Sequence, residues 1–318
     1  MDRIISLSII ALFFLLPFSA RFEPYKAIQT ECDHFGWFPE GFGLKDHSVF
    51  WFRNAYYLVS IYIPGEDKFA YGRSRDLCVW EDNSPVLEER KPGAWDSNKI
   101  WAPFVLEDEG IYYMYYTGVS RGVTQSIMLA ISENPADRDS WIPQGMIFQP
   151  DHPGMVWEAG QWADCRDPFV IKLGDKFYML YTGRDQDGGI IGLATSPDPV
   201  GPWTDWGTII PPLPDQAMAE SPTLVNYRTN YYLFYNHTAQ GERVRVGASI
   251  AGPWSTGRGF SPGWAHEVWQ NPSGVWYSSF LTDYTITISP LVWDEFFYPA
   301  EPFLGSLVTH QLLPVIRR

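Results

Sequence analysis

A hairpin pattern recurs five times along the 318-residue chain and constrains the fold more than any other feature. Each copy has a short apolar run, a turn and a second strand of alternating aromatics, which is typical of a β-hairpin. The aligned first positions of the copies are Asp46, Ala102, Asp167, Glu220 and His266. The second strand's first aromatic follows ten residues later in four copies and eleven after Glu220. Such a repeat indicates an architecture of similar stacked units.

The repeats predict an all-β fold, a five-bladed β-propeller. A small twisted sheet cannot bury both faces alone, so successive sheets pack around an axis and close into a ring. Aromatics at 17%, with 27 Gly and 26 Pro, suit short strands and frequent turns, and long amphipathic patterns are absent. Each of the first four copies continues into a third segment that ends in a tryptophan. We interpret these tryptophans as residues that pack the blades together: Trp80, Trp141, Trp203 and Trp254.

The aligned first positions carry the functional argument. The innermost strand of each blade lines the central channel, so these positions should meet at one mouth of it. Three of the five are carboxylates: Asp46, Asp167 and Glu220. Converging acids push their pKa values apart, which lets one act as an acid while another remains a base. The alternative, that each acid merely begins a strand as a turn residue, fits any one of them better than all three in register.

Composition limits the partners that the chain can have, and the N-terminal segment indicates its location. A net charge of -14 and a pI near 4.8 argue against a nucleic-acid partner, since phosphate binding needs clustered basic residues.

Residues 1–20 contain an apolar run from Ile4 to Phe18 that is too short to span a bilayer comfortably. We therefore expect a signal peptide and a secreted or periplasmic protein, with no membrane partner after its removal. The cleavage site is poor, because Phe18 occupies the third position before a cut after Ala20, and a retained anchor stays open. An irregular lead-in, 21–43, would precede a single propeller, 44–318.

The cysteines do not suggest a metal site. Cys32, Cys78 and Cys165 are odd in number and lack Cys-x-x-Cys spacing, which argues against zinc and allows one disulfide with one free thiol. Cys165 lies two residues before Asp167, but no Cys-His pattern accompanies it. We therefore interpret it as a small buried residue rather than a nucleophile.

Four short motifs resemble the five-bladed glycosidases of glycoside hydrolase families 43, 32 and 62. They are Lys45-Asp46-His47, Trp101-Ala102-Pro103, Arg166-Asp167-Pro168 and Ala219-Glu220-Ser221-Pro222-Thr223. The resemblance covers about residues 34 to 290 and keeps the order Asp, Asp, Glu. It implies that Asp46 is the general base, Glu220 the general acid and Asp167 the carboxylate that tunes their pKa values. Arg166 would hold Asp167 or a sugar hydroxyl by charge-assisted hydrogen bonds.

The family assignment decides the stereochemistry. Families 43 and 62 invert, whereas family 32 retains. The Arg166-Asp167-Pro168 motif is similar to family 32, but that family's opening motif is missing and Ser221 stands where it usually has Cys. Family 43 matches better, although His47 replaces a proline or small residue. We expect inversion and leave retention open, since carboxyl separation distinguishes the two.

Further residues are expected at the channel mouth. Four tryptophans lie within a dozen residues before an aligned position and are candidate sugar platforms, with packing as the alternative: Trp37, Trp101, Trp162 and Trp264. His47, next to Asp46, is a candidate for substrate binding. The resemblance also implies that His266 lies near the axis, where many family 43 members have a calcium ion or a water cluster. No cofactor is expected to be required, and a structural calcium in the channel stays open beside a hydrogen-bonded core histidine.

The expected function is hydrolysis of a glycosidic bond in an oligo- or polysaccharide, of the arabinofuranosidase or xylosidase kind. Two rivals remain. A non-catalytic carbohydrate-binding propeller would need no acid–base pair, and a glycoside phosphorylase similar to family 130 would need several basic residues at the mouth. Only Arg166, His47 and His266 are obviously placed there. The sequence leaves the sugar, the linkage, exo or endo action and the oligomeric state open.

Overall fold

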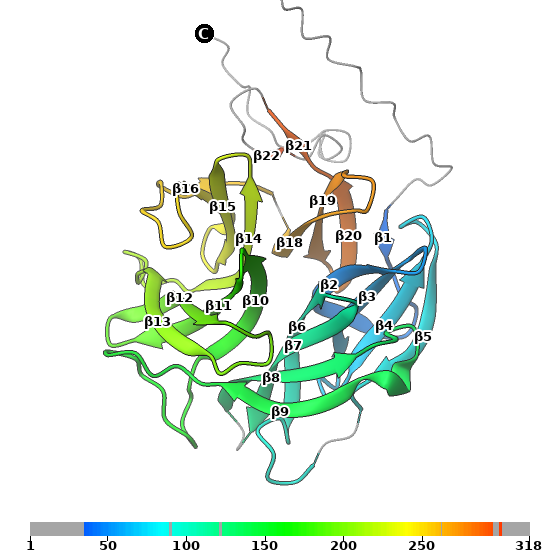
Figure 1. Cartoon of the computed structure of the whole chain (residues 1–318), viewed down its shortest axis with the longest axis horizontal. Coiled ribbons are helices and arrows are strands. Elements are labelled where there is room, and N and C mark those ends of the chain that lie inside the picture. Colours follow the sequence, from blue (N-terminus) through cyan, green and yellow to red (C-terminus); the bar gives the residue numbers. More distant parts are fainter. Residues whose placement is uncertain (1–34, 89–90, 121–122, 262, 295–298, 301–318) are drawn as a thin grey trace, which may run out of the picture. The chain divides into compact units, whose positions relative to one another are not determined.

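The computed structural model describes residues 35–88, 91–120, 123–261, 263–294 and 299–300. The predicted signal peptide and the lead-in through residue 34 lie outside these ranges. The described residues belong to one compact unit. They are nearly all strand, arranged as five four-stranded sheets around a central axis (Figure 1), and this confirms the predicted all-β propeller. Within the described ranges, no helix has the length and apolar character that a membrane crossing needs.

Each blade is an antiparallel sheet, and the strand that begins its predicted hairpin lies innermost (Figure 1). Blades 1 and 2 contain β2 (Gly43–Phe52), β3 (Ala55–Ile63), β4 (Phe69–Ser74), β5 (Trp80–Val86), β6 (Lys99–Asp108), β7 (Ile111–Ser120), β8 (Thr124–Ser132) and β9 (Ile142–Phe148). Blades 3 and 4 contain β10 (Cys165–Leu173), β11 (Lys176–Asp185), β12 (Gly188–Ser196), β13 (Thr204–Ile210), β14 (Ala219–Tyr227), β15 (Asn230–His237), β16 (Gly241–Gly247) and β17 (Arg258–Gly259). Blade 5 contains β18 (Trp264–Gln270), β19 (Trp276–Thr282), β20 (Thr285–Pro290) and β1 (Gly36–Trp37). A 3-10 turn, Arg138–Ser140, and a small ribbon of β21 (Val292–Trp293) and β22 (Pro299–Ala300) complete the described elements.

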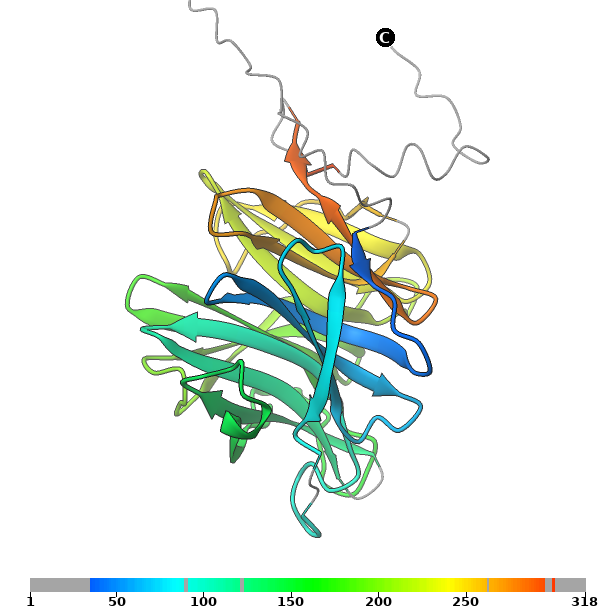
Figure 2. The same cartoon turned by 90° about the vertical axis from the view of Figure 1, so that its right-hand side faces the viewer.

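The ring is closed by a strand from the segment that was expected to be irregular. β1 pairs antiparallel with β20 and supplies the outer strand of blade 5 (Figure 2). Gly36 has a φ of 141°, and a Cβ there would lie 2.2 Å from the carbonyl oxygen of Ile286, so only glycine fits. A first-to-last blade pairing of this kind ties the N-terminal part of the propeller to its end.

Trp37 belongs to this closure and not to a sugar site, which corrects the prediction. Its side chain is 2% exposed, and its ring stacks on that of Trp80 with centroids 6.0 Å apart. Its Nε1 donates to Asp82 Oδ1 at 2.7 Å. The indole therefore contributes core packing where blade 1 meets blade 5.

Aromatic rings fill the space between blades. Phe50 of blade 1 contacts Tyr112 of blade 2 at a centroid distance of 5.6 Å, and Phe104 of blade 2 contacts Phe169 of blade 3 at 4.6 Å. Such pairs add about 1 kcal/mol each beyond the area they bury. Trp141, 4% exposed, packs in the same interface, as its predicted blade-packing role requires. Cys165 is free and fully buried, in agreement with its interpretation, while Cys78 is disulfide-bonded.

A bulge interrupts every innermost strand at the same level. The first and second strands of each blade pair in register except at residues 46, 102–103, 167–168, 221–222 and 265–266. In four blades the first bulge residue has a positive φ: Ala102, Asp167, Ser221 and Ala265. A bulge leaves residues out of the ladder and increases the local twist.

The bulges correct the alignment that the sequence suggested. Glu220 pairs with Asn236 as Arg166 pairs with Thr182, so Glu220 is equivalent to Arg166 and precedes the bulge. His266 is the second bulge residue of blade 5 and therefore lies one position later. The spacing of eleven residues after Glu220 was the available signal, because counting from Ser221 restores ten.

Candidate active site

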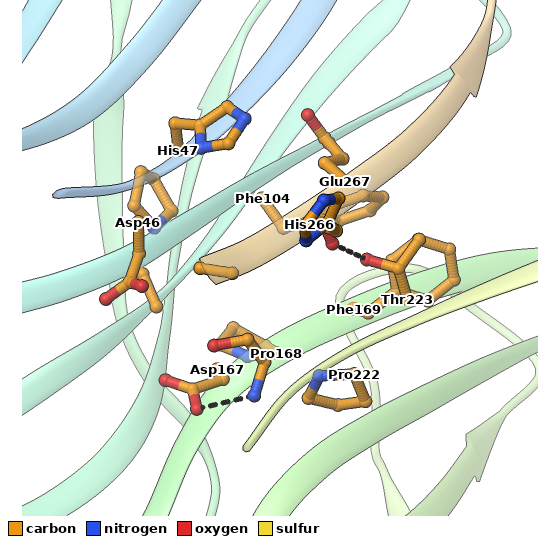
Figure 3. Close-up of a pocket in the computed structure, with 14 residues that line it drawn as sticks. Asp46, His47, Phe104, Asp167, Pro168, Phe169, Pro222, Thr223, His266 and Glu267 are labelled. Carbon is orange, nitrogen blue, oxygen red and sulfur yellow. Dashed lines mark hydrogen bonds between the residues drawn. The ribbon is translucent and has the colours of Figure 1, made fainter. Parts of the chain in front are cut away.

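A pocket of about 490 Å³ opens at the mouth of the axis and is lined from all five blades. It brings together the three predicted acids: Asp46 from β2, Asp167 from β10 and Glu220 from β14. A second cavity of about 40 Å³ adjoins it along the axis and shares Asp46 and Asp167 as lining residues (Figure 3). The carboxylates thus converge on one pocket although they are not equivalent positions of the repeat.

Asp46 stands at the bulge of β2 with its carboxyl toward Asp167 (Figure 3). Burial, followed by repulsion from Asp167 and Glu220, raises its pKa to about 7, against the opposing effect of Lys45 and Arg166. A carboxyl with this pKa exchanges a proton near neutral pH. It can therefore accept a proton from water at moderate pH.

Asp167 is fixed in place by two donors on different blades. Its Oδ2 accepts from Thr182 Oγ1 at 2.9 Å and from the backbone nitrogen of Ser221 at 3.0 Å. Burial is the main cause that raises the pKa of Asp167, and Glu220 adds to it, while Arg166 and the hydrogen bonds oppose the rise. Asp167 therefore connects blades 3 and 4 and repels Asp46.

Arg166 connects the acids through its guanidinium. Nη2 donates to Glu220 Oε1 at 2.7 Å, and Nε lies 3.8 Å from Asp167 Oδ2. Nη1 donates to Gln125 Oε1 at 3.1 Å and to Asp164 Oδ1. Burial alone would lower the pKa of Arg166, but the surrounding carboxylates more than offset it and the pKa is raised. Arg166 is thus a permanent cation that orients Glu220, whose side chain is 26% exposed to the pocket.

Three of the four predicted tryptophan platforms line the pocket. Trp162 and Trp264 are 57% and 44% exposed, which leaves ring faces open to a ligand. Trp101 is partly buried, and its Nε1 donates to Glu66 Oε2 at 2.9 Å. Aromatic faces beside carboxylates are the combination that binds the apolar and polar sides of a sugar.

His47 lines the axial cavity and not the pocket, which corrects its predicted place at the mouth. It is 6% exposed, and its Nε2 lies 2.7 Å from Ser279 Oγ. Burial, with a smaller effect of His266, lowers its pKa to about 3. His47 follows Asp46 directly, but it returns to the regular ladder opposite Ser60, after the bulge.

His266 also lies in the axial cavity, as predicted from its position near the axis. Its Nδ1 is 3.2 Å from Glu242 Oε2, and its ring stacks on Phe280 at 4.8 Å. Calcium takes six to eight oxygen ligands. Among the residues that the structure describes, no group of three His, Cys, Asp or Glu side chains is arranged to hold a metal. The calcium ion that the resemblance implied near His266 therefore stays a prediction.

Other pocket residues were missed by the sequence reasoning. Lys45, Glu66, Gln125, Asn236 and Thr238 all line the pocket. Glu66 comes from the turn between β3 and β4, and most of the others lie on second or third strands or on loops. The alignment of first strands carries no signal for such positions. Asp164 was visible beside Arg166, but sequence gives no reason to assign it a contact.

These features define a class of protein, a five-bladed propeller with a carboxylate pocket at its axis. A sequence profile of glycosyl hydrolases family 43 matches residues 42–158. A probable arabinan endo-1,5-alpha-L-arabinosidase C of Aspergillus flavus is 28% identical over 197 residues, 57% of this chain and 57% of that protein. An extracellular endo-alpha-(1->5)-L-arabinanase of Thermotoga petrophila is 28% identical over 180 residues, 49% of this chain and 36% of that protein. The matches thus span little more than half of these relatives at most.

Solved structures share the fold. A thermostable family-43 glycoside hydrolase superposes with a TM-score of 0.68 at 18% identity, covering 91% of this chain and 100% of that one. An exo-1,5-alpha-L-arabinanase from a bovine ruminal metagenomic library gives 0.64 at 19% identity, covering 86% of this chain and 99% of that one. With the profile match, they confirm the predicted resemblance to glycoside hydrolase family 43.

Proposed function

We propose that the protein is a secreted glycoside hydrolase that cleaves an arabinofuranosidic or xylosidic bond of an oligo- or polysaccharide with inversion. The observation that carries the proposal is the convergence of Asp46, Asp167 and Glu220, with Arg166, in one pocket walled by tryptophans. Resemblance to the two arabinanases supports an arabinan-type substrate. The fold similarity to a β-xylosidase/α-arabinofuranosidase keeps xylosides in the substrate class to be tested.

In the proposed mechanism Glu220 protonates the leaving oxygen while Asp46 takes a proton from the attacking water on the opposite face of the sugar. Burial, together with repulsion from Asp167, raises the pKa of Asp46 to about 7, so Asp46 becomes a base as the pH rises through that value. Arg166 holds Glu220 by the 2.7 Å hydrogen bond. The transition state carries positive charge on the sugar, which the surrounding carboxylates stabilise.

The phosphorylase alternative finds less support. Among the described residues that line the pocket, the basic side chains are Lys45 and Arg166. Arg166 already contacts Asp164, Asp167 and Glu220, so its charge is largely balanced. A phosphate at this site would meet three carboxylates, which disfavours its binding.

Secretion is part of the proposal. The Thermotoga relative is described as extracellular, and the N-terminal segment has the composition of a signal peptide. Expression of the full chain followed by N-terminal sequencing of the protein in the medium or periplasm tests this. Retention in the cell with an intact N-terminus would contradict it.

A glycoside panel followed by ¹H NMR tests the activity. The wild-type protein would be mixed with 4-nitrophenyl α-L-arabinofuranoside, 4-nitrophenyl β-D-xyloside and linear 1,5-arabinan. We expect turnover of at least one substrate without phosphate, with the inverted anomer appearing first. Dependence on phosphate would establish the phosphorylase, and binding without turnover would establish the non-catalytic propeller. Asp187→Asn removes an exposed carboxylate from the turn between β11 and β12. It serves as the matched control for substitutions of the pocket carboxylates.

A further inference from the structure

Asp164 is a buried carboxylate beside the pocket that does not line it. It precedes β10 directly and is 1% exposed. Its Oδ1 accepts from Trp162 Nε1 at 3.0 Å and from Arg166 Nη1, and its Oδ2 accepts from Arg184 Nε at 2.6 Å. One carboxylate therefore binds an indole and two guanidiniums.

The charge of Asp164 is maintained by these contacts. Burial on its own raises the pKa of Asp164, but Arg166 and Arg184 more than offset it, and the pKa lies below its ordinary value. Charge-assisted hydrogen bonds to a buried carboxylate are strong and directional. The side chains that Asp164 contacts are therefore held in defined orientations.

Two of these side chains face the pocket. Trp162 presents a 57% exposed ring at the pocket wall, and its Nε1 is bound to Asp164 Oδ1. Arg166, bound to the same oxygen, donates to Glu220 Oε1 at 2.7 Å. A displacement of Asp164 Oδ1 would move both the indole and the guanidinium.

Arg184 provides a second connection toward Glu220. Its Nη2 lies 3.2 Å from the sulfur of Met218, two residues before Glu220 on the approach to β14. Asp164 thus contacts two arginines of blade 3, and each of these contacts a residue in or just before the first strand of blade 4.

We propose that Asp164 is a positioning residue that couples the sugar contact at Trp162 to the orientation of Glu220 through Arg166. The inference rests on the proposed function, because it assigns Glu220 the role of proton donor. Asp164 contacts no substrate itself. It sets the geometry in which the acid delivers its proton, and a misplacement of about 1 Å can cost roughly 10²-fold in rate.

The test compares leaving groups in Asp164→Asn. The amide keeps the size of the side chain but presents a donor where a guanidinium now binds. With linear arabino-oligosaccharides, whose leaving oxygen needs a proton, we expect kcat to fall about 10²-fold. With 2,4-dinitrophenyl α-L-arabinofuranoside, whose leaving group needs none, we expect a loss below about threefold. Equal losses on both substrates would overturn the proposal and leave Asp164 a purely structural residue.

Variants of the residues that contact Asp164 test the coupling. Trp162→Phe keeps an aromatic ring but loses the indole Nε1–H donor. We therefore expect KM for the oligosaccharide to rise with little change in kcat. In an Asp164→Ala background the same substitution should have almost no further effect on KM, because the acceptor for Trp162 Nε1 is already absent. Additive effects would contradict the coupling. Should Asp164→Asn fail to fold, Arg184→Gln removes one guanidinium from a 38% exposed position and should show a smaller loss with the same dependence on leaving group.

An NMR measurement is independent of turnover. The indole Nε1–H signal of Trp162, assigned from Trp162→Phe, should shift and exchange faster with water in Asp164→Asn, and remain unchanged in Asp187→Asn. An unchanged signal would overturn the positioning role. If the wild-type protein cleaves no substrate, the proposed function fails; a uniform kinetic loss in an active protein refutes only the role of Asp164.

Discussion

The pocket and the axial cavity adjoin each other and are built from the same innermost strands, yet they use buried acids differently. The pocket of about 490 Å³ holds Asp46 and Glu220 beside open space. The axial cavity of about 40 Å³ holds His47, His266 and Glu267 against protein partners. The polar side chains of the pocket are therefore accessible to a ligand, whereas those of the axial cavity are bound to other groups of the protein.

Glu267 shows what the axial groups do. Its Oε1 accepts from Ser48 Oγ and its Oε2 from the backbone nitrogen of Val49, both at 2.7 Å. Ser48 Oγ also accepts from the backbone nitrogen of Val105 at 3.1 Å. Glu267 thus joins blade 5 to blade 1, and through Ser48 to blade 2. We infer that Glu267 stabilises the ring, whereas Asp46 and Glu220 perform chemistry.

The largest expected effect is in the pocket. Asp46→Asn and Glu220→Gln should each lower kcat on arabino-oligosaccharides by about 10²–10⁴-fold, because each removes one proton transfer. Neither should lower Tm appreciably, because Asp46→Asn removes a carboxyl that burial and like charges disfavour, and Glu220→Gln keeps an oxygen that can accept from Arg166 Nη2. Steady-state kinetics and thermal unfolding check both. Near-wild-type turnover in both variants would refute the assigned roles.

Asp167→Asn should have the next largest effect and should change the pH profile. We expect kcat to fall about 10²-fold, since the carboxylate that holds Ser221 and repels Asp46 is lost. Asp167 raises the pKa of Asp46, so its neutralisation lowers that pKa, and the acid limb of kcat/KM should move to lower pH. A limb that stays in place, measured between pH 4 and 9, would show that Asp46 is not the titrating base.

Glu267→Ala should affect stability instead of catalysis. It leaves Ser48 and the backbone nitrogen of Val49 without their buried acceptor, which we expect to lower the free energy of unfolding by about 2 kcal/mol. The folded fraction should keep its kcat. Denaturant unfolding together with steady-state kinetics, with kcat referred to the folded fraction, measures both quantities. A variant that unfolds like the wild type but turns over slowly would reverse the roles given to the two regions.

The smallest effect concerns the pH dependence of stability. Burial raises the pKa of Asp46 from 3.8 to about 7 and that of Glu267 from 4.5 to about 8. Between these values the folded protein binds more protons than the unfolded chain, so these groups stabilise it at low pH and this stability is lost as pH rises to about 8. In Glu267→Gln the free energy of unfolding should fall less steeply between pH 5 and 8, by about 1.4 kcal/mol per pH unit. An identical slope would show that Glu267 does not titrate in this range.

Sequence predicted the blades and the three acids because the hairpin repeat is a long, regular signal. It missed β1, since a strand of two residues carries no periodicity. It misaligned Glu220 because the acid itself was taken as the first position, although the spacing to Tyr231 pointed to Ser221. The contacts of Asp164 and Glu66 were out of reach, since they depend on how loops and turns meet across the ring.

Chemical rescue of Asp46→Gly tests most directly whether Asp46 acts on the face of the sugar opposite the leaving group. With 2,4-dinitrophenyl α-L-arabinofuranoside, azide should occupy the space left by the carboxylate and attack the anomeric carbon. The account predicts that azide restores turnover and gives β-L-arabinofuranosyl azide. An α-azide, or full activity of the variant without azide, would contradict it.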